Sequence, residues 1–275
     1  MTTTRILFLA SISLLLSACE QNTQVAETPT IQYPDWSGQW SRIGSLNWQP
    51  EGYAEVGPPP LSPEYQARRE EYQELRDQGV LVGDPPATCL PPGMPRLMTM
   101  SFPFEMVITE QTSYILADWD SAVRRIFTDG RDWPDYMLPE FNGYSIGQWH
   151  DEDGDGVYDM LSVETRAIKG PRSFDSTAVV LHDNNETVVL EEFRRIDEST
   201  LENTITTIDD ALSGPWTVQR TYSHESFSED VLWVEYVCAE NNRHINLGDD
   251  WYFLNKEEGT LDPTREGQSR LVPED

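Results

Sequence analysis

The chain has 275 residues, of which 48 are acidic and 19 are lysine or arginine, so its formal net charge is −29 at pH 7. A surface of this charge repels nucleic acid and anionic lipid headgroups alike, which argues against nucleic-acid binding. The hydrophobic fraction of 38%, with nine tryptophans and eleven tyrosines, is enough to build a core and favours strands over helices. The length suits one large domain.

Residues 1–18 have the pattern of an export signal. Arg5 precedes an apolar run at 6–16, which is shorter than the roughly 20 residues that a permanent membrane helix needs. The run ends in Leu16-Ser17-Ala18-Cys19, which resembles the lipobox of bacterial lipoproteins. This resemblance implies that the Cys19 thiol receives a diacylglycerol and that the signal is cleaved just before it. The alternative is an ordinary signal peptide with a cysteine at its cleavage site.

The residues after the lipobox indicate where the protein works. By the same resemblance, Glu20 is not the aspartate that retains lipoproteins in the inner membrane, so we expect an outer-membrane protein that faces the periplasm. Two or three acyl chains would give a firm anchor. Residues 19–34 are polar and lack periodicity, which predicts a flexible tether.

Cys89 and Cys238 are the two cysteines that remain once Cys19 is lipidated. A pair of cysteines in an oxidising compartment predicts one disulfide. A loop of about 150 residues closed in this way gives roughly 4–5 kcal/mol in chain-entropy models. A thiol nucleophile or a metal ligand is less favoured, because no CxxC or Cys/His spacing surrounds either cysteine.

The rest of the chain predicts a single β-rich domain over residues 35–255 with a surface helix near 62–78. A serine cap and a proline begin this helix, and the Pro-rich stretch 83–95 that follows predicts an extended loop. Short strands separated by turn signals are then expected at 105–109, 112–119, 123–127, 144–150, 158–166, 177–182, 187–196, 200–208, 216–224 and 231–238. This series predicts an antiparallel meander closed into a lipocalin-like barrel, with a two-sheet β-sandwich as the alternative. Residues 256–275 are expected to form a polar, unstructured tail.

Two resemblances bear on the fold. Gly38-Gln39-Trp40 resembles the Gly-x-Trp of lipocalin-type barrels, whose tryptophan fills the closed end, and the pattern recurs at 147–149. Residues 89–150, 187–196 and 215–238 carry CLPPGMPRLM, RRIFTDGRDWP, GYSIGQW, TVVLEEFRRI and PWTV, and are similar to a widespread family of exported β-rich bacterial proteins without a settled activity. Members often have a histidine-containing segment before the TVVLEEF-like strand. This chain has Phe174-Asp175-Ser176-Thr177 there, which argues against a histidine-based mechanism.

The sequence DEDGDGVYD at 151–159 has the form DxDxDGxxD. Calcium takes six to eight oxygen ligands, and this spacing can bring several carboxylates and one carbonyl to a single ion. The loop lies between two predicted strands, as in the calcium loops of integrin-type β-hairpins, so we expect a structural calcium site. The alternative is a solvated acidic turn. The predicted ligands are Asp151, Asp153, Asp155, the carbonyl of Val157, and Asp159.

The sequence contains no catalytic motif such as GxSxG, HExxH or a P-loop, and its four histidines are scattered. Arginines near one predicted hairpin are candidates for an anionic or hydroxylated ligand, although pairing with neighbouring acids is favoured over such a pocket. They are Arg124, Arg125 and Arg131, with Arg96 from the Pro-rich loop. We therefore expect a non-enzymatic, membrane-anchored protein that binds a small apolar or amphipathic ligand. The alternatives are a hydrolase or isomerase that uses a barrel cavity, and a structural or interaction protein of the cell envelope.

Overall fold

The structure, a computed structural model, describes residues 31–43, 58–78, 82–177, 179–225, 236–238, 243–247, 250–255 and 259–263. The predicted signal peptide, Cys19 and the tether up to residue 30 lie outside these residues. So do residues 231–235 of the last predicted strand.

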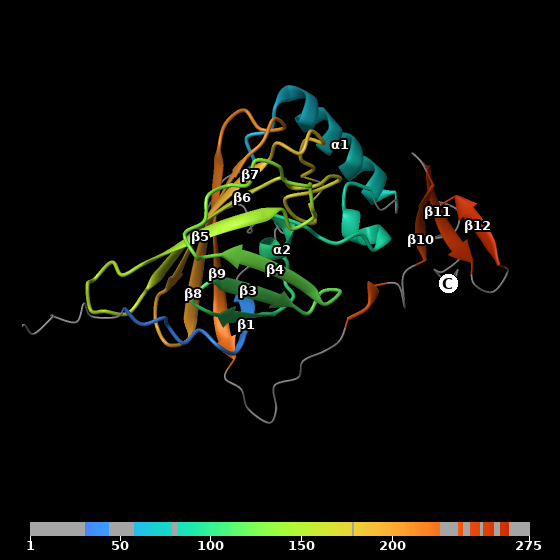
Figure 1. The fold of residues 1–275 in the computed structure, drawn as a ribbon. Helices are drawn as coiled ribbons and strands as arrows, with labels where there is room; N and C mark the ends of the chain where they lie inside the picture. Colours follow the sequence, from blue (N-terminus) through green and yellow to red (C-terminus); the bar gives the residue numbers. More distant parts are fainter. Residues whose placement is uncertain are drawn as a thin grey trace, which may run out of the picture. The chain divides into compact units, whose positions relative to one another are not determined.

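Nine strands form a closed barrel in which each strand pairs with the next and β9 pairs with β1 (Figure 1). The strands are β1 (Gln39–Ile43), β2 (Phe104–Ile108), β3 (Thr112–Ala117), β4 (Ala122–Phe127), β5 (Tyr144–His150), β6 (Met160–Arg166), β7 (Val188–Arg195), β8 (Thr200–Ile208) and β9 (Trp216–Glu225). The prediction of a mainly β, lipocalin-like barrel is confirmed, and the β-sandwich alternative is wrong. Alternate residues of β8 are buried, as expected for a strand with one face inside a barrel.

The prediction of a purely antiparallel meander is wrong at one place. β4 and β5 are parallel and pair only through Ile126 with Ser145 and Phe127 with Ile146. Residues 128–143 connect these strands without a helix or a barrel strand, and carry the chain back along the barrel before β5 begins. A tight turn would have forced antiparallel pairing, whereas this long connection permits a parallel pair.

Helix α1 (Pro63–Asp77) confirms the predicted surface helix. Ser62 is its N-cap residue, proline occupies the first turn, and Tyr65 is its buried residue. Among the described residues, no helix is both long enough and apolar enough to cross a bilayer.

Two loops differ from their predicted form. The stretch 83–95 contains a 3₁₀ turn, η2 (Pro85–Thr88), and is followed by the short helix α2 (Arg96–Thr99), which the sequence did not predict. The strand predicted at 177–182 is absent from the described part of this segment, where only Val180 forms an isolated bridge, with Ser173. Other contacts hold the backbone there, since the amide of His182 donates to the Asp209 carboxylate at 2.9 Å.

A second, three-stranded sheet follows the barrel in the chain. It contains β10 (His244–Leu247), β11 (Asp250–Asn255) and β12 (Thr260–Pro263). β12 lies within the stretch expected to be an unstructured tail, so that expectation does not hold for these residues. The short apolar run in DWYFLN and the turn residue Gly259 before TLDP are the local signals for this hairpin.

The two ends of the barrel have different interiors. We call the end at the β5–β6 turn the hairpin end, and the opposite end, where α2 lies, the α2 end (Figure 1). Aromatic side chains fill the hairpin end. The ring centroids of Trp36 and Trp149 lie 5.0 Å apart, and the Trp40 indole donates to the Trp36 carbonyl at 2.9 Å. Leu97 and Met98 of α2 belong to the same hydrophobic cluster as the inward residues of the strands. α2 therefore packs into the core of the barrel.

Candidate functional site

The acidic turn between β5 and β6 gathers three carboxylates. Ligand oxygens of Asp151, Asp153 and Asp159 all lie within 4.8 Å of one another. The predicted ligand Asp155 is not in this group, and one of its carboxylate oxygens accepts the Val157 amide at 2.8 Å. The structure thus brings together three of the four predicted carboxylates.

Backbone amides fix the carboxylates of this turn. Asp151 accepts from the amides of Gly154 at 2.8 Å and Gly156 at 3.0 Å, and Asp159 accepts from the amide of Glu152 at 3.2 Å. Both glycines have positive φ angles of 76° and 91°, which few other residues adopt. These bonds reduce the charge repulsion in the turn even without a cation.

The four predicted ligand-binding arginines do not form one pocket. Arg124 points into the barrel, whereas Arg125, the next residue, lies exposed beside an outer groove of about 790 Å³. Arg131 is also on the outside, where it pairs with Asp129 at 2.6 Å and stacks over Phe127. Arg96 is buried on α2. The alternation of β4 separates Arg124 from Arg125, which a grouping by sequence proximity overlooks.

Arg124 and Glu191 form an ion pair inside the barrel, with at most 1% of either side chain exposed. Arg124 donates to both oxygens of the Glu191 carboxylate and to the Thr165 hydroxyl at 2.9 Å. Asn203 donates to the same carboxylate at 3.0 Å. A buried pair with this many hydrogen bonds is a closed, charge-neutral unit.

The segment leading into α2 is fixed by the backbone. Gly93 has a φ of +62°, and a β-carbon there would lie 2.5 Å from the Phe141 carbonyl oxygen, so this turn requires glycine. The Met94–Pro95 peptide is cis, and the Met94 amide donates to the Phe141 carbonyl at 2.9 Å. The carbonyl of Met98 accepts the Tyr222 hydroxyl at 2.7 Å, which connects α2 to β9.

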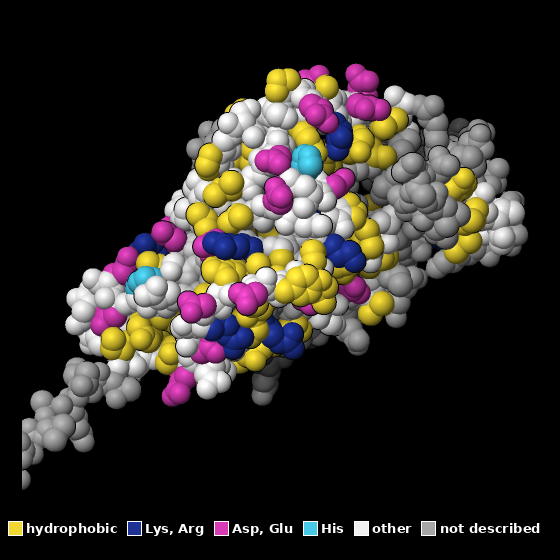
Figure 2. Space-filling model, turned by 45° about the horizontal axis from the view of Figure 1, so that its top comes forward, with side chains coloured by type: hydrophobic (Ala, Val, Ile, Leu, Met, Phe, Trp, Pro, Cys, Tyr) yellow, Lys and Arg dark blue, Asp and Glu magenta, His cyan; other side chains and the backbone are white. Residues whose placement is uncertain are grey.

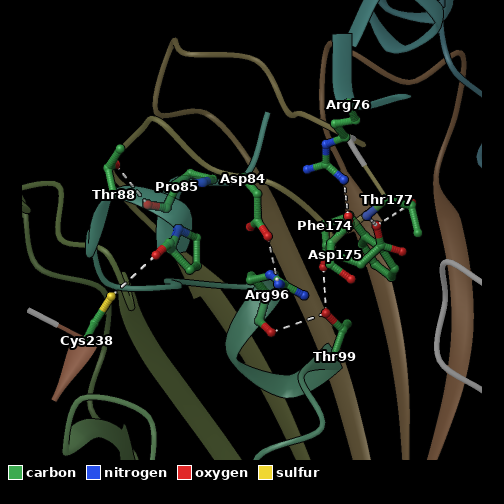
Figure 3. A network of polar contacts seen from close by, with 12 residues as sticks. Arg76, Asp84, Pro85, Thr88, Arg96, Thr99, Phe174, Asp175, Thr177 and Cys238 are labelled. Atoms are coloured by element: carbon green, nitrogen blue, oxygen red, sulfur yellow. Dashed lines mark hydrogen bonds and ion pairs between the residues drawn. The ribbon is translucent and has the colours of Figure 1, made fainter. Parts of the chain in front are cut away.

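Charged side chains from six segments meet around α2, and we call them the arginine cluster. Its members are Arg42 of β1, Arg76 of α1, Arg96 of α2, Arg220 of β9, and the acids Asp84 and Asp175 from two loops. Arg96 donates to the Asp84 carboxylate at 3.2 Å, and Thr99 donates to the Phe174 carbonyl at 2.6 Å (Figure 3). Arg42 donates to the Thr99 carbonyl at 2.6 Å. The cluster therefore surrounds the short helix that closes the barrel interior.

Burial dominates the electrostatics of the arginine cluster. It lowers the pKa of Arg42, which the nearby positive charge of Arg220 lowers further. Burial also lowers the pKa of Arg76. The pKa of Asp84 is raised because burial outweighs the opposing charges of Arg96 and Arg76. These directions show that charged groups lie here in a poorly solvated environment.

The loop that carries Phe174 and Asp175 is held by a further buried arginine. Arg172, with 2% of its surface exposed, donates to the Thr187 hydroxyl at 2.6 Å and to the carbonyls of Ile168 and His182. Asp175 in turn accepts the Thr177 amide at 2.8 Å. Arg172 is therefore a positioning residue for the loop, outside the arginine cluster.

The sequence indicated only Arg96 among the members of the arginine cluster. A signal for Arg220 was present, because it alternates with Val218 and Tyr222 on the inward face of β9. Arg76, Asp84 and Asp175 meet only through tertiary packing, for which no local pattern exists. In sequence, the chain matches no known protein family and no curated protein.

The predicted disulfide and the scattered histidines can now be placed in the structure. The disulfide between Cys89 and Cys238 is confirmed, with a Cα–Cα distance of 5.4 Å. It ties the residue after η2 to a segment that follows the barrel. Histidines described with their side chains bond elsewhere: His150 contacts Ser162, and His224 contacts the Ser37 carbonyl.

Proposed function

We propose that this protein is an exported lipoprotein, anchored in the outer membrane through Cys19 and facing the periplasm, whose barrel binds a small amphipathic molecule at the α2 end. The observation that carries this proposal is a pair of unsatisfied polar atoms at that end. Arg96 Nε and one Asp84 carboxylate oxygen are buried without a hydrogen-bond partner among the described residues. Buried polar atoms are normally satisfied by protein, water or a ligand.

The same end also contains apolar side chains. The ring centroids of Phe174 and Trp216 lie 4.3 Å apart beside the arginine cluster, and Met98 of α2 belongs to the same hydrophobic cluster. Small-molecule sites combine such apolar surface with a few placed polar groups. An amphipathic ligand would place its polar group among the charged side chains and its chain against the aromatic ones.

Binding can be tested on the mature chain carrying Cys19→Ser, which needs no detergent. We expect mass spectrometry of the purified protein under non-denaturing conditions to detect a bound amphipathic molecule, and added dodecanoate or dodecanol to displace it. A protein that carries no such molecule, and that binds neither probe in calorimetry, would contradict the proposal.

The anchor has its own test. Radiolabelled palmitate should be incorporated into the wild-type protein in a Gram-negative host and not into Cys19→Ser, with the labelled protein in the outer-membrane fraction. Incorporation into Cys19→Ser, or release of the wild-type protein as a soluble form, would contradict the anchor.

A structural calcium ion in the acidic turn is a second proposal, supported by the convergence of Asp151, Asp153 and Asp159. We expect millimolar calcium to raise the melting temperature of the wild-type protein. Asp151→Asn should abolish this shift. Asp197→Asn is the matched control, because Asp197 lies in the β7–β8 turn and likewise accepts a backbone amide, from Ser199 at 2.8 Å. A wild-type melting curve unaffected by calcium would contradict the site.

A further inference from the structure

A groove of about 760 Å³ lies over the outer face of β5, β6 and β7, and we call it the aromatic groove. Paired residues of neighbouring strands point to the same face of a sheet, so the side chains of its floor form two rows. The rows are Gln148, Ser162 and Glu192, and beside them Ile146, Glu164 and Leu190. Their neighbours along each strand are buried, so both rows face outward. The volume lies within the range of about 300–1,000 Å³ that small-molecule sites occupy.

Aromatic side chains border this floor and are fixed by other contacts. The ring centroids of Tyr33 and Tyr158 lie 5.2 Å apart, and Trp133 comes from the connection between β4 and β5. The Tyr158 amide donates to the carbonyl of Gln32, the residue before Tyr33, at 2.9 Å. The Arg166 guanidinium lies 4.2 Å from the centroid of the Trp133 ring. The rings are therefore in place without a ligand.

The charges that line the aromatic groove are balanced. Each charged lining residue is paired with one of opposite charge: Arg131 with Asp129, Glu164 with Arg166, Glu192 with Arg194, and Glu191 with Arg124 inside the barrel. Basic and acidic side chains are likewise interspersed on the face shown in Figure 2. Balanced charges give little net attraction to an ion, so a neutral ligand suits the groove better.

The floor also has hydrogen-bonding capacity. A carboxylate has about four acceptor sites on its two oxygens, so Glu164 and Glu192 can accept further bonds beside their arginines. Gln148 is exposed, and its amide can both donate and accept. An apolar ligand would cover these polar groups without matching them, which is costly. Flat aromatic rings and planar polar groups together match a sugar ring, which has apolar C–H faces and hydroxyls at its edge.

We infer that the aromatic groove binds a neutral saccharide. Trp133 packs against the face of a pyranose ring, and Gln148 and Glu192 bond to its hydroxyls. Ile146 and Leu190 contact its less polar part. This site lies on the outside of the barrel and depends neither on the ligand proposed for the α2 end nor on calcium in the acidic turn.

The test titrates the mature Cys19→Ser chain with trisaccharides by calorimetry. The neutral probes are cellotriose, maltotriose and N-acetylated chitotriose. The charged probes are trigalacturonate, which is an anion, and deacetylated chitotriose, which is a cation. At least one neutral probe should bind with a dissociation constant of about 1 mM or lower, and at least about tenfold more tightly than both charged probes.

Variants locate the site on the barrel. Trp133→Ala should weaken binding of the neutral probe about tenfold, because it removes the stacking surface, and Gln148→Ala about fivefold, because it removes hydrogen bonds. Tyr136→Ala is the matched control for the aromatic residue, since Tyr136 lies exposed on the same connection and lines the other outer groove. Gln219→Ala is the control for the amide, since Gln219 lies exposed on the outer face of β9. Both controls should bind within about twofold of the parent chain.

Three results would overturn the inference. The first is failure of all three neutral probes to bind at concentrations up to about 10 mM. The second is binding of a charged probe as tight as that of the best neutral one. The third is unchanged affinity in both Trp133→Ala and Gln148→Ala, or equal losses in these variants and their controls. A melting curve for each variant shows that it is folded, and Gln148→Ala tests the groove even if Trp133→Ala unfolds.

Discussion

Two buried arginine sites in this protein differ in composition: one is a closed ion pair, and the other is a cluster of charged side chains from several segments. Arg124 lies in the interior opposite Glu191, and the pair is closed by a hydrogen bond from Arg124 to the Thr165 hydroxyl and one from Asn203 to the Glu191 carboxylate. Arg96 is the first residue of α2 and belongs to the arginine cluster, where it pairs with Asp84. The first site satisfies itself and stabilises the strands around it. The second joins charged side chains from several segments at the end of the barrel where we propose that a ligand binds, so burial alone does not identify a binding site.

The largest effect on stability is expected at the self-satisfied pair. Glu191→Ala should lower the free energy of unfolding by about 3–5 kcal/mol, because it leaves the Arg124 charge buried without its partner. Urea denaturation measures this change. Asp129→Ala, which removes an exposed partner of Arg131, is the control and should cost far less, because water screens exposed ion pairs. Similar small losses in both variants would contradict the structural role of the interior pair.

Removal of the disulfide is expected to have the next largest effect on stability. Replacing Cys89 and Cys238 together by serine removes a crosslink between residues 149 positions apart in the chain, and should lower the free energy of unfolding by about 2–5 kcal/mol. Dithiothreitol should shift the wild-type urea midpoint to that of the variant and leave the variant unchanged. A wild-type midpoint that does not respond to the reductant would indicate that the bond does not form in solution.

The pH dependence of stability should differ in sign between two aspartates. Burial raises the folded-state pKa of Asp84 above its usual value of 3.8, so its contribution to stability is present at low pH and is lost as pH rises through the raised pKa. Asp84→Asn removes this loss. The melting temperature of the variant minus that of the wild type should therefore increase from pH 4 towards neutrality.

Asp197 provides the opposite case. Hydrogen bonds from Ser199 lower the pKa of Asp197, so its contribution is present above its usual pKa and is lost as pH falls through the lowered value. Asp197→Asn should therefore lose melting temperature relative to wild type as pH rises from acid to neutral. Parallel curves for the two variants would contradict the burial of Asp84.

Much of the barrel could be predicted from local patterns. The bounds of β5 and β8 match the prediction because alternating burial and flanking turn residues are both readable in the sequence. The parallel pairing of β4 with β5 could not be predicted, because it depends on the path of residues 128–143. α2 was missed because four residues are too short for a helical period to appear.

The two candidate sites also differ in how far they could be predicted from the sequence. The acidic turn is contiguous in sequence, so Asp151, Asp153 and Asp159 could be assigned to one site from spacing alone. The arginine cluster draws on β1, α1, α2, β9 and two loops. Nothing in the order of these segments along the chain places Arg42 near Arg220. The closure of the barrel does so, through the pairing of β1 with β9.

The most direct test of the binding proposal asks which end of the barrel responds to a ligand. Met94 and Met98 lie at the α2 end, and Met160 lies at the start of β6 near the acidic turn; all three are buried. In mature Cys19→Ser protein labelled with ¹³C at the methionine methyl groups, titration with dodecanoate should shift the Met94 and Met98 resonances and leave that of Met160 in place. A shift of Met160 with Met94 and Met98 unmoved, or no shift at saturating dodecanoate, would contradict binding at the α2 end.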